Sequence, residues 1–287
     1  MLLQLFVSGL SVGMIYALMA MGLILIVRAV GVLNFAHGDV FVVGAYIAYM
    51  FIQQLQFSFL ISLLLATIIY IVFGVIFMLT VYWPLRDAAW LVTVTISTIG
   101  ASMAINESVR FFWGPFPLRL PPIVEGAVRF GGASLEYQYL FILVIATLLI
   151  AFVYILFEKS FIGKQMQATA QDRYAAEMMG IPTVVTIAAT YGISFALSGI
   201  GGMLAGPLFL VSQSLNTFSL KAFAGIVIGG FGSIKGAVIG SLLIGLIEAY
   251  VTLFTTTYKD AMVFVVLILV LIVRPQGLFG EKIADKA

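Results

Sequence analysis

Residues 2–27 have the sequence LLQLFVSGLSVGMIYALMAMGLILIV, an apolar stretch that runs without a charged side chain to Arg28. The hydrocarbon core of a bilayer is about 30 Å thick, and an α-helix needs about 20 residues to cross it. A cleaved signal peptide carries a positively charged start and a shorter apolar run. Residues 2–27 are therefore expected to remain in the protein as a membrane-spanning helix.

The composition of the whole chain supports the same conclusion. Of the 287 residues, 63% are hydrophobic and 9% are charged, and the mean hydropathy is +1.18. A soluble protein carries about 25% charged residues, and a disordered chain is poor in apolar ones, so both classes are excluded. The formal charge of +2 provides no basic field for nucleic acid. The composition predicts an integral membrane protein.

Candidate spans recur along the sequence. Backbone polar groups must be paired inside a membrane, which favours helices. The apolar segments of suitable length are residues 2–27, 57–83, 90–105, 138–157, 183–211, 236–254 and 260–273. Residues 41–52 and 222–231 are shorter and lie beside polar or glycine-rich runs, as broken helices around a transporter site do. The predicted fold is all-α: one polytopic transmembrane helix bundle over residues 1–287, with eight or nine membrane segments that include short or broken helices.

Two long connections separate these spans. Residues 107–137 contain Pro115, Pro117, Pro121 and Pro122, which predict an ordered external loop with turns. Residues 158–182 are polar and rich in alanine, and Gly180 and Pro182 are helix-stop signals at their end. This second connection is expected to be a cytoplasmic helix.

The basic residues of the connections predict the orientation. With nine passes and residues 158–182 in the cytoplasm, the N terminus lies outside and the C terminus inside. The cytoplasmic side then holds Arg28, Arg86, Lys159, Lys164, Arg173, Lys235, Arg274, Lys282 and Lys286. The external side holds Arg110, Arg119, Arg129, Lys221 and Lys259. This excess of cytoplasmic basic residues follows the positive-inside rule.

Small residues recur at four-residue spacing within the spans. The pairs are Gly9 and Gly13, Gly202 and Gly206, Gly225 and Gly229, Gly236 and Gly240, and Ser241 and Gly245. Such pairs allow helices to approach closely in lipid, where no hydrophobic force drives them together. They predict a tightly packed bundle.

Two spans carry a polar stripe on one helical face. One stripe consists of Ser241, Gly245, Glu248 and Thr252, and the other of Thr95, Thr98, Ser102 and Asn106. Glu248 either lines a passage or is satisfied by a neighbouring helix. The hydroxyls either line a polar path or bond back to their own helix.

Asn34, His37 and Asp39 stand at the entrance of the short segment 41–52. Asn34 or Asp39 suits the N-cap of that helix, and polar side chains at a broken helix also suit a substrate. One histidine is too few for a proton relay or a metal site, so we predict no metal and no catalytic residue. The residues assigned to a translocation path are Asn34, His37, Asp39, Thr98, Ser102, Ser241 and Glu248.

The glycine-rich run 229–236 does not form a nucleotide-binding loop. Its Lys235 is followed by Gly236, whereas such a loop needs Ser or Thr after the lysine. We therefore expect no cofactor in this chain, and any ATP is expected to be bound by a partner.

Four segments carry a more specific pattern. Residues 31–39, GVLNFAHGD, are followed by Gly44-Ala45-Tyr46, and the others are residues 163–181, 225–236 and RPQGLFG at 274–280. Together they resemble the high-affinity branched-chain amino acid ABC transporter permeases of the LivH type. In that family these segments correspond to the signature, the loop offered to the ATPase, a late glycine-rich segment and the common ending.

The resemblance implies a permease subunit, not an enzyme, of an ATP-driven importer of branched-chain, hydrophobic amino acids. It implies a multi-pass protein of the prokaryotic plasma membrane that contacts lipid and no nucleic acid. The implied partners are a LivM-like second permease subunit, two cytoplasmic ATPase subunits and an external solute-binding protein. Asp172, Arg173, Glu177 and Gly180 are expected on the ATPase-facing surface. A urea or amide importer of the same family and an ion-coupled secondary transporter are the alternatives.

Overall fold

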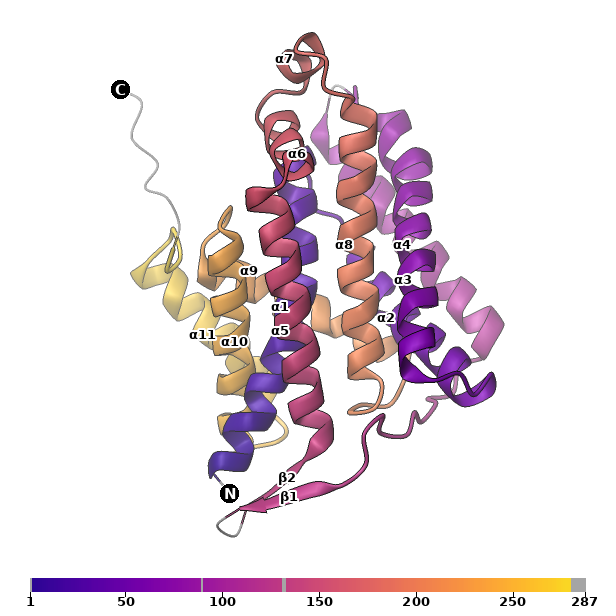
Figure 1. Cartoon of the computed structure of the whole chain (residues 1–287). Helices are drawn as coiled ribbons and strands as arrows, with labels where there is room; N and C mark the ends of the chain where they lie inside the picture. Colours follow the sequence, from indigo (N-terminus) through magenta and orange to yellow (C-terminus); the bar gives the residue numbers. More distant parts are fainter. Residues whose placement is uncertain (1, 89, 131–132, 280–287) are drawn as a thin grey trace.

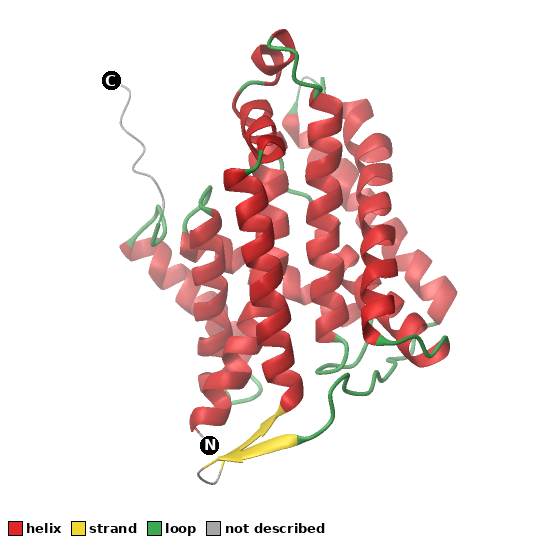
Figure 2. Cartoon of the chain, viewed as in Figure 1, coloured by secondary structure: helices red, strands yellow, loops and turns green. Residues whose placement is uncertain are grey.

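The chain folds into a bundle of helices with one short β-hairpin, as the computed structural model shows (Figure 1). The structure describes residues 2–88, 90–130 and 133–279. The helices are α1 (Leu2–Val30), α2 (His37–Ala48), α3 (Phe59–Phe77), α4 (Leu91–Trp113), α5 (Tyr137–Lys159), α6 (Phe161–Gln171), α7 (Arg173–Met178), α8 (Thr183–Ala205), α9 (Thr217–Gly229), α10 (Ile234–Val251) and α11 (Lys259–Val273). Strands β1 (Ala127–Phe130) and β2 (Ala133–Glu136) pair antiparallel. Figure 2 shows how small a part of the molecule these strands form.

Helices α1 and α8 form the centre of the bundle. In their most apolar windows, 83% of the residues of α1 and 72% of those of α8 are buried, against 22% in α3 and in α5. The outer helices leave large apolar side chains exposed, such as Leu64 on α3 and Phe152 on α5. A bundle with an apolar exterior of this kind fits a lipid environment.

In the part of the chain that the structure describes, five helices are long and apolar enough to cross a membrane: α1, α3 with its continuation to Leu85, α5, α8 and α10. A helical membrane protein is therefore confirmed. Among the described residues, α2, α9 and α11 contain only 12, 13 and 15 residues. The count of eight or nine membrane segments stays a prediction.

Helices α2 and α9 match the two segments predicted to be short. Residues 41–52 belong to α2 and to the π-helical turn Tyr49–Gln54 that prolongs it. Residues 222–229 of the second segment belong to α9, and Gly230, with a φ of +111°, follows the end of this helix. A methyl group on Gly38 would collide with the side chains of Asn216 and Ser219, so the two helices begin against each other.

The small-residue pairs lie where helices touch. A methyl group on Gly13 would collide with the α10 backbone, and one on Gly245 would collide with the α1 backbone. Gly225 and Gly240 face each other across α9 and α10 in the same way. The tight packing predicted from these pairs is confirmed, because only glycine permits such close contact between main chains.

The first long connection is shorter than predicted. Helix α4 continues to Trp113, so the loop predicted for residues 107–137 begins at Gly114, where a φ of +80° ends the helix. Backbone hydrogen bonds of 2.9 and 2.8 Å between Leu118 and Val211 then fasten it to the segment after α8. The hairpin β1–β2 completes this ordered connection.

The single helix predicted for residues 158–182 is wrong. The chain forms two helices, α6 and α7, with Asp172 between them. Asp172 has an extended backbone (φ −153°), and its side chain accepts a hydrogen bond from the N–H of Ala175. The residue thus caps α7 instead of continuing α6.

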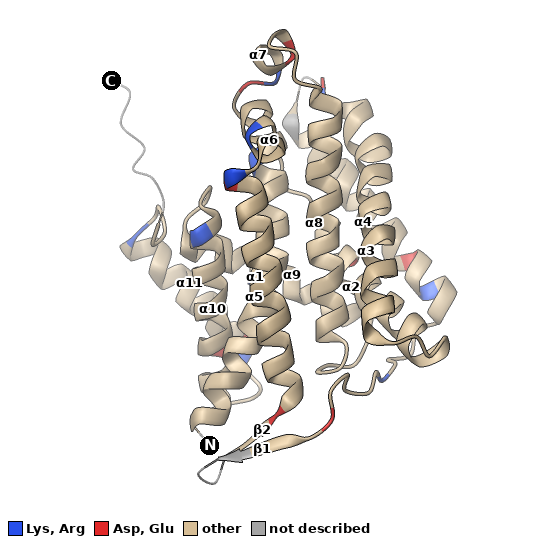
Figure 3. Cartoon of the chain, viewed as in Figure 1, with Lys and Arg blue, Asp and Glu red and all other residues tan. Residues whose placement is uncertain are grey.

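The two ends of the bundle differ in charge. The N terminus and the hairpin lie at one end, and α6 and α7 lie at the opposite end (Figure 1). Basic residues at the end of α5, on α6 and at the start of α10 gather toward this second end (Figure 3). We call it the α6–α7 end. Lys282 and Lys286 lie outside the described residues.

The last described residues fold back onto α9. Gly277 has a φ of +76° and turns the chain after α11. The backbone N–H groups of Leu278 and Phe279 then donate to the carbonyl oxygens of Ile228 and Gly229 at 2.8 and 2.9 Å. These bonds satisfy carbonyl groups that the end of a helix leaves free.

Candidate functional site

A polar cluster surrounds Asp39 in the first turn of α2. Its Oδ1 accepts hydrogen bonds from Asn106 Nδ2 at 2.8 Å and from Asn216 Nδ2 at 2.6 Å, and its Oδ2 accepts one from the Ser102 hydroxyl. Only 1% of Asp39 is exposed. Three neutral donors and the start of a helix thus satisfy a buried carboxylate. We call Asp39, Ser102, Asn106 and Asn216 the Asp39 cluster.

The cluster joins three elements of the fold. Ser102 and Asn106 lie one turn apart on α4, and Asn216 immediately precedes α9. The Gln213 side chain donates to the Asn106 carbonyl at 3.0 Å, which holds the segment before α9 against α4. A displacement of α2, α4 or α9 therefore changes the surroundings of the Asp39 carboxylate.

Asn34 and Thr98 shape the chain that leads into α2. Asn34 Oδ1 accepts the N–H of Ala36 at 3.0 Å, and Thr98 Oγ1 accepts the N–H of Phe35 at 3.2 Å. Thr98 also donates to the carbonyl of Thr95 at 2.8 Å. The N-cap residue of α2 is Ala36, without a side-chain cap, so the N-cap role predicted for Asn34 or Asp39 is wrong. The Asn34 side chain instead closes the turn of residues 34–36, just before α2 begins.

His37 is packed between α1 and α8. Its Nε2 lies 3.2 Å from the carbonyl oxygen of Met19, and its ring centroid lies 6.3 Å from that of Phe195. The Ser198 hydroxyl donates to the His37 carbonyl at 3.1 Å. Gly22 leaves room for the ring, since a methyl group there would lie 3.1 Å from it. The histidine thus fixes the start of α2 against both central helices.

A cavity of about 150 Å³ lies beside Asn34 and His37. Its other walls are Leu23, Leu33, Phe35, Ser219, Leu220 and Phe223. Asn34 Nδ2 and His37 Nδ1 are buried and have no hydrogen-bond partner in the described part of the chain. Mainly apolar walls with a few polar groups are typical of a site for a small, partly apolar molecule.

Glu248 belongs to a separate ionic network. Lys221 Nζ lies 2.7 Å from Glu248 Oε1, and the Tyr16 hydroxyl donates to Oε2 at 2.6 Å. Lys221 also lies 2.8 Å from Asp260, and Lys259 lies 3.6 Å from Glu248. Lys221 is 5% and Glu248 7% exposed. The structure thus favours a glutamate satisfied by neighbouring helices, here α1, α9 and α11.

The predicted path residues consequently lie in different places. Those that come together around the start of α2 are Asn34, His37, Asp39, Thr98 and Ser102. Glu248 lies in its own network, and Ser241 is buried against Gly225 of α9. Within residues 2–88, 90–130 and 133–279, no three His, Asp or Glu side chains gather to hold a metal ion.

Three residues that complete these clusters were not assigned to the path. Asn106 continues the polar stripe of Thr98 and Ser102 along α4, so the spacing of polar residues in the sequence already indicated that it lies on the same helical face. Asn216 and Lys221 lie just before the short segment 222–231. Their position beside a predicted broken helix was the only feature of the sequence that pointed to them. Lys221, predicted in an external connection, is buried within α9.

The predicted coupling residues determine the shape of α7. Glu177 Oε1 accepts hydrogen bonds from Arg173 Nε at 3.1 Å and from the Thr183 hydroxyl at 2.6 Å. The Thr183 hydroxyl and then Arg173 hold the pKa of Glu177 below its usual range. Asp172 caps the start of α7, and Gly180, with a φ of +79°, follows its end. All four residues thus have structural roles within this segment.

Arg173 attaches α7 to the segment between α3 and α4. Its Nη1 lies 3.5 Å from Asp87 Oδ1, and its guanidinium lies 5.0 Å from the ring centroid of Trp83. The outer surface of α7 and its end is apolar, because Tyr174, Met178 and Met179 are 75%, 74% and 82% exposed. Exposed apolar side chains that lie together are typical of surfaces that bind another protein or a membrane.

Comparisons with curated proteins give matches along nearly the whole chain. The chain is 33% identical over 300 residues to the high-affinity branched-chain amino acid transport system permease protein BraD of Pseudomonas aeruginosa, covering 99% of this chain and 97% of that protein. It is 32% identical, with the same coverage, to LivH of Escherichia coli strain K12. About half the chain, 52%, is 29% identical to the galactose/methyl galactoside import permease protein MglC of the same strain, 47% of which it covers.

A solved structure shares the fold. The complex of PsaBC from Streptococcus pneumoniae with a Fab contains a chain that superposes with a TM-score of 0.53 at 12% sequence identity, covering 94% of this chain and 91% of that one. A family model described as branched-chain amino acid transport system, permease component, matches residues 5–271. The chain therefore belongs to the permease components of branched-chain amino acid transport systems.

Proposed function

We propose that this chain is the permease subunit of an ATP-driven importer that carries branched-chain, hydrophobic amino acids across the plasma membrane of a prokaryote. The observation that carries this proposal is the full-length similarity to BraD and LivH, whose names describe that transport. The glycine-rich run 229–236 lacks the Ser or Thr that a nucleotide-binding loop needs after its lysine, and in this proposal separate ATPase subunits supply the energy.

The cavity beside Asn34 and His37 suits part of such a solute. Its walls include Leu23, Leu220 and Phe223, which match a hydrocarbon side chain. The unpartnered atoms Asn34 Nδ2 and His37 Nδ1 offer hydrogen bonds to polar atoms of the solute. The Asp39 cluster lies at the start of the same helix and couples the cavity to α4 and α9. The path thus passes the starts of α2 and α9.

The two cytoplasmic ATPases contact the α6–α7 end in this proposal. The exposed Tyr174, Met178 and Met179 enter a groove of the ATPase, while Asp172, Arg173, Glu177 and Gly180 hold α7 in shape. Because Arg173 also contacts Asp87 and Trp83, a displacement of α7 by the ATPase is transmitted to the segment that joins α3 to α4. A LivM-like second permease subunit and an external solute-binding protein complete the assembly.

The orientation that follows has the N terminus outside and the C terminus in the cytoplasm. It is supported by the position of the N terminus and the β-hairpin opposite the α6–α7 end (Figure 1). It is also supported by the basic residues that gather at the α6–α7 end (Figure 3).

Uptake into vesicles that contain the reconstituted importer tests the proposed function. With ATP and the solute-binding protein present, leucine, isoleucine and valine are expected to accumulate, and urea and galactose are not. Uptake of leucine driven by an ion gradient without ATPases would instead show a secondary transporter. ATP-dependent uptake of urea alone would reassign the substrate and leave the importer class in place.

A further inference from the structure

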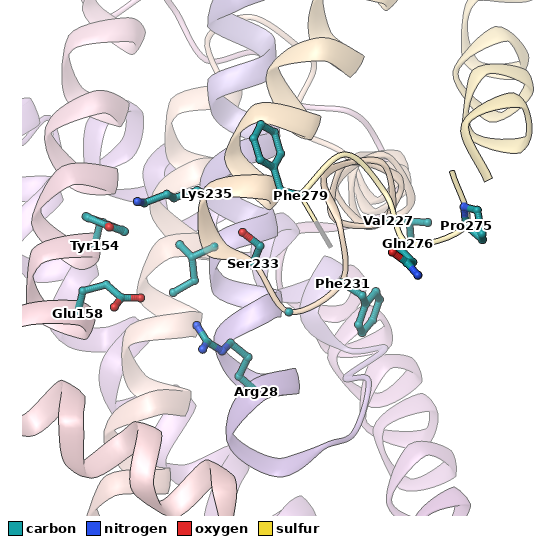
Figure 4. A pocket seen from close by; sticks show the side chains of 12 residues that line it. Arg28, Tyr154, Glu158, Val227, Phe231, Ser233, Lys235, Pro275, Gln276 and Phe279 are labelled. Carbon is teal, nitrogen blue, oxygen red and sulfur yellow. The ribbon is translucent and has the colours of Figure 1, made fainter. Parts of the chain in front are cut away.

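A second and larger cavity, of about 680 Å³, opens at the α6–α7 end of the bundle. Figure 4 shows its lining side chains, which come from the ends of α1 and α5, the α9–α10 turn and the residues after α11. We propose that this cavity binds the phosphodiester headgroup of an anionic phospholipid. The solute path at Asn34 and His37 lies in a different cavity, so this site is additional to transport.

The charges that face this cavity favour an anion. Arg28 and Lys235 enter it from α1 and α10, and Glu158 enters it from α5, which leaves a formal charge of +1 (Figure 4). The structure gives Arg28 and Lys235 contacts with aromatic rings: Arg28 lies 5.3 Å from the ring centroid of Phe157, and Lys235 lies 5.6 Å from that of Tyr154. In the described residues neither of these cations has a carboxylate within ion-pair distance. A phosphodiester with one negative charge balances this set.

The start of α10 adds to the attraction. Helix α10 begins at Ile234, and the Ser233 hydroxyl accepts the N–H of Gly236 at 3.1 Å. Ser233 and Ile234 both line the cavity, so the positive end of the helix dipole faces it. Two cations and a helix start around one cavity are a combination suited to phosphate oxygens.

The surface that leads to the cavity identifies the ligand as a lipid. Val144, Leu148, Ala151 and Ile155 recur on α5 at helical spacing and are all exposed, and Glu158 continues the same face into the cavity. This apolar stripe gives an acyl chain a path along the helix while the headgroup occupies the charged end. A soluble phosphate compound has no acyl chain that could contact this stripe.

Aromatic side chains stand at the same level. Tyr154, Phe231 and Phe279 line the cavity together with the charged residues (Figure 4). Aromatic rings and long basic side chains gather at the boundary between the hydrocarbon and the headgroups. The cavity therefore lies at the depth at which a phospholipid carries its phosphate.

The test titrates lipid onto the purified, delipidated importer complex and counts bound molecules by native mass spectrometry. The probes are phosphatidylglycerol, phosphatidylcholine with the same acyl chains, and glycerol 3-phosphate as a headgroup without chains. The unmodified complex is expected to bind phosphatidylglycerol most tightly. Arg28→Gln and Lys235→Gln should each weaken that binding about five-fold, the usual effect of one basic residue at a membrane surface.

Three further variants make the test specific. Lys159→Gln removes an exposed lysine that lies next to Glu158 in sequence and does not line the cavity, and it should leave phosphatidylglycerol binding unchanged. Arg28→Lys keeps the charge and should retain most of the binding. Glu158→Gln removes the carboxylate that lines the cavity and should tighten the binding of phosphatidylglycerol. Thermal unfolding in a nanodisc that contains only phosphatidylcholine confirms that each variant is folded.

Several results would overturn the proposal. Equal losses in Lys159→Gln and Lys235→Gln would show a general charge effect. Equally tight binding of phosphatidylcholine would remove the preference for an anion, and tight binding of glycerol 3-phosphate would point to a soluble ligand. Loss of the ATPase subunits from folded Arg28→Gln, with unchanged lipid binding, would identify the cavity as a subunit contact.

Discussion

Asn216 donates its side-chain amide to Asp39 at 2.6 Å and so joins the start of α9 to the start of α2, across 177 positions of sequence. Both helices are short and begin against each other inside the bundle. Because Asp39 also accepts from Ser102 and Asn106, one carboxylate fixes the relative positions of three helices. The interaction therefore links the two broken helices beside the proposed path.

Replacement of Asn216 by Ala should lower both stability and transport. The change removes a donor from a buried carboxylate, at a cost of about 1–3 kcal/mol. Thermal unfolding in detergent should show a lower midpoint, and leucine uptake should fall. Ser214→Ala, in which an exposed hydroxyl two positions earlier is lost, is the matched control and should behave like the unmodified protein. Equal stability of both variants would show that the Asn216 contact contributes nothing.

Replacement of Lys221 by Met should destabilise the protein strongly. Glu248 would remain buried without its nearest cation, and loss of one partner of a buried ion pair costs about 3–5 kcal/mol. The double variant Lys221→Met with Glu248→Met should regain much of that loss, because it leaves no unpaired buried carboxylate in α10. The free energies of unfolding of both single variants and the double variant provide the measurement.

Lys259 offers the control for this second prediction. It lies 3.6 Å from Glu248, but its side chain is 37% exposed, so Lys259→Met should cost about 1 kcal/mol or less. If Lys259→Met and Lys221→Met were equally damaging, burial of the Lys221 pair would not be the cause.

Replacement of Gly225 by Ala should separate α9 from α10. A methyl group at this position would lie within 2.9 Å of Ser241 main-chain atoms, and overpacking of this kind costs about 1–3 kcal/mol. Gly100→Ala on α4 meets no atom within 4 Å and should be neutral or stabilising by up to about 1 kcal/mol. Thermal unfolding of the two variants compares an enclosed glycine with a free one. A Gly225→Ala protein as stable as Gly100→Ala would contradict the close contact.

Replacement of Met178 and Met179 by Ser should reduce ATP-driven uptake without unfolding the permease. Both side chains are exposed on the proposed ATPase contact, so their loss removes apolar contact area only in the assembly. The readouts are solute-stimulated ATP hydrolysis and leucine uptake in vesicles. Phe116→Ser, which removes an equally exposed apolar side chain from the loop after α4, should have no effect. Normal coupling in the methionine variant would disprove the contact.

The membrane class and most helices were predictable from the sequence because apolar length depends on local composition. Residues 2–27 and 138–157 correspond closely to α1 and α5. The break at Asp172 was not predicted, because residues 158–182 lack an internal proline and Asp172 acts through its cap on α7. Asp172 can either continue a helix or cap the next one, and the alanine content of the segment does not decide between these two structures.

The site was predicted only in part, for a similar reason. Asn34, His37, Asp39, Thr98 and Ser102 were assigned from their places beside a broken helix and on one face of a span. Asn216 enters the cluster through contact between segments far apart in sequence, and no periodicity within a single segment signals that contact. Glu248 was noticed as an unusual carboxylate, but its pairing with Lys221 depends on the packing of α9 against α10.

The backbone bonds from Leu278 and Phe279 to the end of α9 restrict where this protein can be truncated or tagged. A truncation after Arg274, or an affinity tag fused there, would expose the carbonyl groups of Ile228 and Gly229. It would also delete Pro275, Gln276 and Phe279 from the wall of the larger cavity. Affinity tags are therefore better placed beyond residue 279 with a flexible spacer, so that purification leaves this short return of the chain intact.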